Sequence, residues 1–291
     1  MSSSDPANSS NPHADGDALS RLIDQVGLRA RTFFTGTACD TTTYAARDDG
    51  VGHLHLLRHG TMSLWLEDGR RIELGEPTLV VLGRSSTHTM DTSREPGADL
   101  VCAEIELGLT GGSPLLVGFP EILAVPLAAV PGLGKTLDLL FQEAFGEQFG
   151  RQAALDRLIE LLLVLLLRHC VATGRFDVGL LAGLADPRLA RALERMHAAP
   201  DRHWTLERLA EAAGMSRASF AATFKARVSV PPGDYLTMLR LAAAARGLRD
   251  GLPLKTIAAR TGYGSATALA RAFRQRYGES PGAWGARARG A

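Results

Sequence analysis

The last third of the chain contains the same short pattern twice, and a duplicated unit limits the possible folds more than any other feature of the sequence. In each copy, apolar residues at helical spacing lead to a glycine, and a serine follows within three residues. The glycines are Gly214 and Gly262, and the serines are Ser216 and Ser265. Glycine adopts the left-handed backbone that ends a helix in a tight turn, and serine is a favourable cap for the next helix. Each copy therefore predicts two helices joined by a tight turn.

The second helix of each copy has one apolar side and one free side. Phe220 and Phe224, like Leu269 and Phe273, are four residues apart, so each pair lies on one side of its helix. The other side can enter the major groove of DNA, where the base edges carry a distinctive pattern of donors and acceptors. A helical bundle without a ligand is the alternative, but such a bundle would not require the turn to be duplicated.

The distribution of charge favours DNA as the partner. Residues 181–291 contain 18 Lys and Arg against 8 Asp and Glu, a net charge of +10, whereas residues 1–180 contain 14 against 23, a net charge of −9. Neutralisation of phosphates by basic side chains supplies most non-specific DNA affinity. The basic part of the chain coincides with the duplicated helices, so the sequence predicts a domain that binds double-stranded DNA.

Several stretches of this region match one family in the right order, namely residues 204–210, 215–220, 262–265, 271–274 and 277–284. Through them, residues 186–288 resemble the DNA-binding domain of the AraC/XylS family of bacterial transcription regulators. The resemblance implies two helix-turn-helix units joined by a long helix, here expected over residues 233–248, which recognise two successive segments of the major groove. The DNA would be a promoter, and RNA polymerase would be a further partner if the protein activates transcription.

The DNA contacts are expected on the exposed side of the second helix of each unit. In the first unit these positions are Arg217, Ala218, Ser219, Ala221, Ala222 and Lys225, and in the second they are Ala266, Thr267, Ala270, Arg271 and Arg274. Arg271 has the geometry to bond guanine O6 and N7 together, whereas Arg274 and Lys225 suit phosphates. The first helix has few polar side chains for base contacts, because Ala222 stands where many family members carry a long polar residue.

The N-terminal part has the pattern of a β-rich domain. Between residues 32 and 109, short apolar stretches alternate with turns, which predicts a small barrel or sandwich. This region resembles the cupin-type sensor domain of many AraC-type regulators, through residues 55–60, 66–74 and 79–88.

Residues 120–185 return to helical spacing. The helix around residues 155–167 is apolar on most of its circumference, so it is either fully buried or packed on a second copy of the chain. Equivalent helices form dimers in the resembled family, which favours a homodimer.

Together these patterns predict an α+β protein, in which a cupin-like β-barrel and a helical dimerisation segment precede an all-α domain with two helix-turn-helix units. The expected parts are a disordered N-terminus (1–16), the sensor domain (17–119), the helical dimerisation and linker segment (120–185) and the DNA-binding domain (186–291). The N-terminus lacks the basic start and apolar run of a signal peptide, and the longest apolar run, residues 161–167, is too short to cross a bilayer. We therefore expect a cytoplasmic protein without a membrane partner.

Three histidines form the most metal-like group of the sensor region. His53 and His55 alternate onto one face of a strand, and His88 ends a later strand that a barrel can bring near them. Metal-binding cupins usually add a glutamate a few residues after such a pair, but residues 58–60 are Arg, His and Gly. We therefore expect the histidines to line an effector pocket or simply to pack, with no metal, no cofactor and no catalytic residue. The rival hypothesis is a metal-dependent cupin enzyme fused to a DNA-binding domain, which metal analysis of the protein would test.

Two cysteines indicate a redox signal through a second resemblance. The chain is most similar to the AraC-type regulators that respond to reactive chlorine species, through residues 17–22, 101–104 and 215–220. In that subgroup, cysteines that match Cys39 and Cys102 carry the redox response. The residues themselves leave the question open, because strand alternation puts Glu104 and Glu106 on the face of Cys102, where they would raise the pKa of its thiol. Buried cysteines also serve as small apolar residues. The expected effector is a small molecule or an oxidant.

Overall fold

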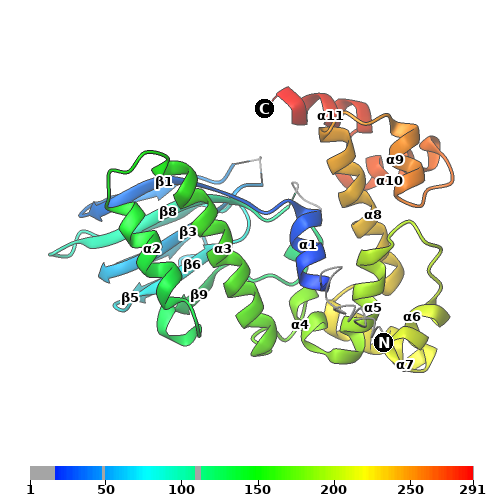
Figure 1. Ribbon diagram of the computed structural model, residues 1–291, viewed down its shortest axis with the longest axis horizontal. Coiled ribbons are helices and arrows are strands. Elements are labelled where there is room, and N and C mark those ends of the chain that lie inside the picture. The colour runs from blue at the N-terminus through cyan, green and yellow to red at the C-terminus, as the bar shows by residue number, and fades with distance from the viewer. Residues whose placement is uncertain (1–16, 48–49, 109–112, 291) are drawn as a thin grey trace, which may run out of the picture.

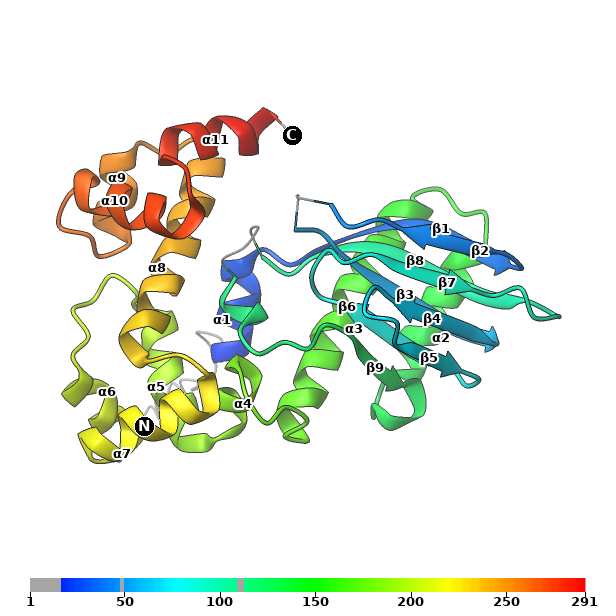
Figure 2. The same cartoon turned by 180° about the vertical axis from the view of Figure 1, so that it is seen from behind.

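The computed structural model describes residues 17–47, 50–108 and 113–290, so the predicted disorder of residues 1–16 lies outside the described part of the chain. Two β-sheets occupy one side of the molecule and a group of helices the other (Figures 1 and 2). The α+β class is confirmed, with a strand-rich sensor part followed by a helical C-terminal part.

The sensor part contains two antiparallel sheets that pack face to face. The five-stranded sheet has the order β1 (Arg29–Ala38), β8 (Ala98–Glu106), β3 (Gly52–Gly60), β6 (Thr78–Leu82) and β9 (Leu123–Pro126). The four-stranded sheet has the order β2 (Thr41–Tyr44), β7 (His88–Asp91), β4 (Met62–Leu66) and β5 (Arg71–Leu74). Apolar side chains from both sheets, such as Leu57, Leu64 and Val80, form one buried cluster between them. The architecture is therefore the predicted barrel or sandwich.

Two details of this region differ from the prediction. Residues 120–133 contain no α-helix: they include β9, which alternates buried and half-buried side chains and pairs with β6 at the edge of the larger sheet. The sensor sheet therefore extends past residue 119, and the long helices start only at Gly134. His88 begins β7 instead of ending a strand.

Helices cover the outer face of the five-stranded sheet (Figure 1). They are α2 (Gly134–Ala144) and α3 (Arg151–Ala172), while α1 (Ala18–Val26), α4 (Leu180–Ala185) and the short 3₁₀ turns η1 (Pro114–Leu116) and η2 (Leu127–Ala129) complete this part. Helix α1 begins the described chain, and its N-terminus is capped by Asp17. Most of the apolar circumference of α3 is buried within the chain itself, including Leu155, Ile159 and Leu162.

The C-terminal part contains the two predicted helix-turn-helix units. Its helices are α5 (Pro187–Ala198), α6 (Leu206–Ala213), α7 (Arg217–Val228), α8 (Pro232–Arg249), α9 (Leu254–Arg260), α10 (Ala266–Tyr277) and α11 (Pro281–Gly290). Gly214 and Gly262 both have the left-handed backbone, with φ of 67° and 72°. Ser216 and Ser265 accept the backbone N–H groups of Ser219 and Ala268, so both predicted caps are present. The long helix α8 differs from its predicted range by one residue at each end.

The two units are attached to the sensor part differently. The core of the first unit, including Phe220 and Phe224, is continuous with that of the sensor part. The second unit has a separate core around Phe273 and Trp284, carried by α8. Polar contacts also join the parts: Arg246 donates to the carbonyl of Asp24 at 2.6 Å. No helix in the described residues is long and apolar enough to span a membrane.

Candidate DNA interface and sensor centre

The two helix-turn-helix units lie at opposite ends of α8, on the side turned away from the sheets (Figures 1 and 2). The pair α6–α7 is at the N-terminal end of α8, and the pair α9–α10 is at its C-terminal end. With 18 residues, α8 is about 27 Å long at 1.5 Å per residue. One turn of DNA spans about 34 Å, so α8 separates α7 and α10 by a length comparable to the spacing between successive major grooves.

The predicted contact positions lie largely on the surface of α7 and α10. Those that are exposed are Arg217, Ala218, Ser219, Ala222, Lys225, Thr267, Arg271 and Arg274, and those that are half-buried are Ala221, Ala266 and Ala270. On the opposite sides, Phe220, Phe224, Leu269 and Phe273 are fully buried. Arg217 forms an ion pair with Glu207 at 2.7 Å. Both side chains are more than half exposed, and such pairs contribute little stability, so DNA can replace this partner at low cost.

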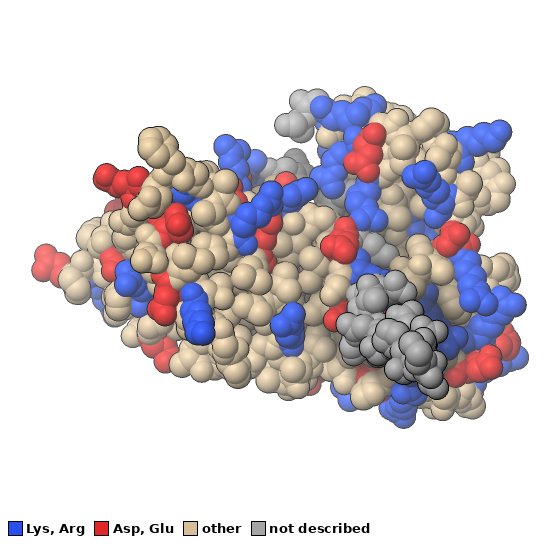
Figure 3. Space-filling view, viewed as in Figure 1, with Lys and Arg blue, Asp and Glu red and all other residues tan. Residues whose placement is uncertain are grey.

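Basic side chains are concentrated on the C-terminal part (Figure 3). Lys225 and Arg227 lie in the last turn of α7, and Arg274 and Arg276 lie in the last turn of α10. In each unit, exposed residues therefore stand at the start of the helix and cations follow at its end. This is the arrangement that phosphate contacts require on either side of a groove.

In the sensor part, the three predicted histidines come together between the sheets. His53, His55 and His88 are all buried, and Nε2 of His55 lies 2.9 Å from Nε2 of His88. Nδ1 of His55 lies 3.2 Å from Sγ of Cys102, which is opposite it in the β3–β8 ladder. Nδ1 of His88 lies 3.0 Å from the carbonyl oxygen of Ser86. The histidines thus form a closed centre that includes Cys102, which we call the thiol–histidine centre.

Aromatic rings cover this centre on its outer side. Tyr44 of β2 is half-buried, stacks on His88 with ring centroids 5.0 Å apart, and touches the rings of His53 and His55. Phe33 of β1 is 44% exposed and packs on Tyr44 and His53. Sequence patterns give no sign of Tyr44 or of the Cys102 contact, because both depend on the register of strands that are distant in the sequence.

Burial sets the protonation of the centre. It raises the pKa of the Cys102 thiol well above its usual range, and it lowers the pKa of His55, helped by the charges of His88 and His53. The pKa of His88 is also lowered by burial, against the opposing effect of its bond to Ser86. The thiol pKa is therefore raised as strand alternation predicted, but burial is the cause and not the neighbouring glutamates.

The thiol–histidine centre is arranged as a chain of hydrogen bonds. Both ring nitrogens of His55 face side-chain partners, whereas a metal site needs three or more ligand atoms that converge on one point. Within the described ranges, no group of three His, Cys, Asp or Glu residues is placed to hold a metal ion.

The two cysteines of the predicted redox pair are far apart. Phe34 is opposite Cys102 in the β1–β8 ladder, and Cys39 follows Phe34 by five residues, which is about 16 Å along a strand. Cys39 is exposed at the end of β1, whereas Cys102 has no exposed surface. Since a disulfide needs Cα atoms about 4.4–6.8 Å apart, these cysteines cannot pair without a rearrangement of the sheet. Cys170 is buried in α3.

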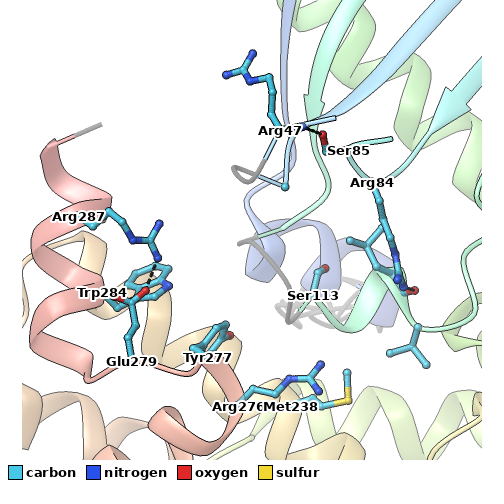
Figure 4. A pocket seen from close by; sticks show the side chains of 13 residues that line it. Arg47, Arg84, Ser85, Ser113, Met238, Arg276, Tyr277, Glu279, Trp284 and Arg287 are labelled. Atoms are coloured by element: carbon cyan, nitrogen blue, oxygen red, sulfur yellow. Dashed lines mark hydrogen bonds and ion pairs between the residues drawn. The ribbon is translucent and has the colours of Figure 1, made fainter. Parts of the chain in front are cut away.

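A cleft of about 760 Å³ separates the sensor part from the second helix-turn-helix unit. Figure 4 shows Arg47 and Arg84 on its sensor side and Tyr277, Trp284 and Arg287 on the opposite side. Arg84 donates to the carbonyl of Leu116 at 2.6 Å. The end of α10 thus faces the sensor part across the cleft.

Comparison with known proteins matches the same two parts. A family model described as a cupin matches residues 17–172, and a helix-turn-helix domain model matches residues 209–287. A putative AraC-like transcription regulator of Streptomyces lividans is 32% identical over 88% of this chain and 94% of that protein. The RCS-specific HTH-type transcriptional activator RclR of Escherichia coli K12 is 30% identical over 94% of this chain and 98% of that protein. The DNA-binding domain of AdpA, solved with a target DNA, is 29% identical over 35% of this chain and 92% of that chain, with a TM-score of 0.34.

Proposed function

We propose that this chain, which belongs to the AraC-type family of DNA-binding transcription regulators, contacts promoter DNA through α7 and α10. We propose further that an oxidant that reacts at Cys102 controls this binding. The proposed DNA contact is supported mainly by the two capped helices α7 and α10, which lie at opposite ends of α8. Each of them has an exposed side that ends in basic residues. The protein would act in the cytoplasm, without catalytic turnover of its own, as the names of its full-length relatives as regulators support.

The structure of the sensor part supports an oxidant as the effector in preference to a large organic molecule. The Escherichia coli relative is named as an RCS-specific activator, and the centre between the sheets of this chain places a cysteine in direct contact with a histidine. The three histidines are closed off from solvent, which disfavours a large organic effector at that place. If the protein is an activator as that relative is named, RNA polymerase is its second partner.

A direct structural connection links Cys102 to the DNA-binding part. Strand β8 carries both Cys102 and Glu106, and Glu106 lies 3.8 Å from Arg249 at the end of α8. A chemical change that moves β8 therefore acts on the helix that sets the separation of α7 and α10. Coupling of this kind between two sites amounts to about 1–3 kcal/mol in proteins, or about 5- to 150-fold in affinity.

The test of this proposal is the affinity of the full-length protein for DNA from its own upstream region, measured at one fixed salt concentration. Reduced protein is compared with protein treated with hypochlorous acid, for the wild type, Cys102→Ala and Cys39→Ala. We expect oxidation to change the wild-type affinity at least about fivefold, and we expect this response to be absent in Cys102→Ala and retained in Cys39→Ala. A response that survives in Cys102→Ala would move the signal to another residue, and no specific binding in any state would refute the promoter interaction.

We also propose that the protein is a homodimer joined through α3. The chain's own core covers most of α3, but Leu158, Leu161 and Leu165 form a stripe that is only partly covered, and Leu161 is 44% exposed. Sedimentation velocity is expected to show a dimer for the wild type and a monomer for Leu161→Glu. Ala153→Glu, at an exposed position of the same helix, is the matched control and should remain dimeric. A dimer that tolerates Leu161→Glu would place the interface elsewhere.

A further inference from the structure

Three hydrogen bonds run from Cys102 to the carbonyl of Ser86, and they fix the position of each proton within them when His55 and His88 are neutral. The carbonyl of Ser86 can only accept, so Nδ1 of His88 carries a hydrogen. In a neutral His88, Nε2 is then an acceptor, and Nε2 of His55 must donate to it. Nδ1 of His55 is therefore an acceptor as well, and the S–H group of Cys102 donates to it. All three donors point in one direction, from the thiol toward Ser86.

A shift of two protons produces a second arrangement that keeps every hydrogen bond. The thiol proton passes to Nδ1 of His55, and the Nε2 proton of His55 passes to Nε2 of His88. Cys102 is then a thiolate that accepts a hydrogen bond from His55, and His88 is an imidazolium that donates through both ring nitrogens. No atom moves far, and the carbonyl of Ser86 accepts in both arrangements.

We propose that His55 and His88 form a proton relay that makes the buried Cys102 thiol reactive toward small, uncharged electrophiles. This inference rests on the proposed function, in which an oxidant acts at Cys102, and it assigns the chemistry of that step. A nucleophile, a base within hydrogen-bond distance and a third group that orients the base are the parts that activate thiols and hydroxyls in enzymes. His55 is the base, and His88 is the positioning residue that fixes the tautomer of His55 and accepts the second proton.

The reaction with hypochlorous acid balances without any further reagent. The sulfur attacks chlorine, so that an S–Cl bond forms while the Cl–O bond breaks. The departing hydroxide takes up the proton that the relay removed from the thiol, and the products are a sulfenyl chloride and water. Sulfur is oxidised by two electrons and chlorine is reduced by two. The electrophile must be small and uncharged, because Cys102 has no exposed surface and Tyr44 covers the histidines.

Residues from three strands surround the relay. Tyr44 of β2 stacks on His88, His53 of β3 meets the ring of His88 edge-on, and Leu66 of β4 is opposite His88 in the ladder. Burial lowers the pKa of His55, and the charges of His88 and His53 lower it further. The pKa of Tyr44 is raised first by burial and then by the charges of Cys102 and Asp40.

The relay predicts a pH profile that an ordinary thiol does not have. A thiol that must ionise before it reacts becomes about tenfold faster per pH unit below its pKa. With the relay, the rate is constant while both histidines are neutral. It falls only when the pH drops through their pKa values, which burial holds below the usual range. The reaction of Cys102 is therefore expected to be nearly independent of pH above pH 6.5.

The test uses methyl methanethiosulfonate, a small neutral thiol reagent without a titrating group, on the full-length protein between pH 6.5 and 8.5. Modification of each cysteine is followed by peptide mass spectrometry, so the exposed Cys39 is a reference in the same sample. An ordinary thiol with a pKa of about 8.5 becomes about 50-fold more reactive over this range. We expect the rate at Cys39 to rise in this steep manner and the rate at Cys102 to change less than about threefold. In His88→Gln, the amide oxygen still accepts from His55 but cannot take a proton. The rate at Cys102 in this variant should fall at least about tenfold at pH 7.

Four outcomes would overturn the relay. The first is a rate at Cys102 that rises with pH as steeply as the rate at Cys39, and the second is an unchanged rate at Cys102 in folded His88→Gln. The third is that Cys102 is not modified in the folded protein. The fourth is a rate at Cys102 that is independent of reagent concentration, because such a rate would report opening of the sheets. The wild-type pH profile decides the matter even if His88→Gln does not fold. Because this assay contains no DNA, the relay and the control of DNA binding can fail separately.

Discussion

Replacing Gly262 by alanine is expected to destabilise the second helix-turn-helix unit by about 2–4 kcal/mol and to abolish tight promoter binding. The left-handed backbone alone costs a non-glycine residue about 1–2 kcal/mol. In addition, a Cβ atom at Gly262, where φ is 72°, would lie 2.6 Å from the carbonyl oxygen of Asp201. That backbone is held in place because Arg240 of α8 donates to the carbonyls of Pro200 and Arg202. In Gly262→Ala, the loop before α6 and the turn before α10 therefore cannot both keep their wild-type positions.

Two other glycines are controls for this prediction. Gly214 occupies the equivalent turn of the first unit, but its nearest neighbour to an added Cβ would be the end of the Arg191 side chain at 3.5 Å. Gly214→Ala should therefore cost only the backbone term of about 1–2 kcal/mol. Gly264 has ordinary backbone and nothing within 4 Å of an added Cβ, so Gly264→Ala should be almost neutral. Urea denaturation and promoter affinity measure all three variants, and equal losses for Gly262→Ala and Gly264→Ala would refute the steric explanation.

The helix-turn-helix units could be predicted from the sequence because their determinants are local. A glycine that ends one helix and a serine that caps the next lie within three residues of each other, and both were present at the positions expected. The same holds for α8, which starts after Pro231 and ends near Gly251. Short apolar stretches separated by turns likewise indicated a strand-rich sensor part. Strand β9 could not be found in this way, because it owes its place to β6, about 45 residues earlier in the chain.

The thiol–histidine centre could be predicted only in part. The alternation of side chains along a strand predicted that His53 and His55 share one face. In the structure, His88 contacts both of them. The contact between His55 and Cys102 depends on the register of β3 against β8, since the two residues form a pair in that ladder. A shift of one residue would point Cys102 to the opposite face of the sheet. Register is set by packing of the whole sheet, so neither this contact nor the cover provided by Tyr44 has a local signal.

Replacing Arg271 by alanine is expected to weaken binding to the correct promoter sequence by about 1–3 kcal/mol, or about 5- to 150-fold, and to remove the preference for one base pair. The exposed side of α7 offers mostly alanines, and its one arginine at the start, Arg217, is paired with Glu207. We therefore expect sequence discrimination by direct hydrogen bonds to depend on α10, where Arg271 is exposed one turn after Thr267. Affinities are measured for the promoter fragment and for a panel of single base-pair variants at one salt concentration.

Arg274→Ala is the matched control for Arg271→Ala, because Arg274 is also exposed and lies three residues further along the same helix. As a phosphate contact, Arg274 should contribute equally to every DNA sequence, and its loss should reduce the slope of log affinity against log salt by about one. Arg271→Ala should leave that slope nearly unchanged and should instead make the base-pair variants bind alike at one position. If Arg271→Ala weakens all sequences equally and lowers the slope, Arg271 contacts the backbone. Sequence preference would then have to come from the shape of the DNA or from the alanine side chains of α7 packed against thymine methyl groups.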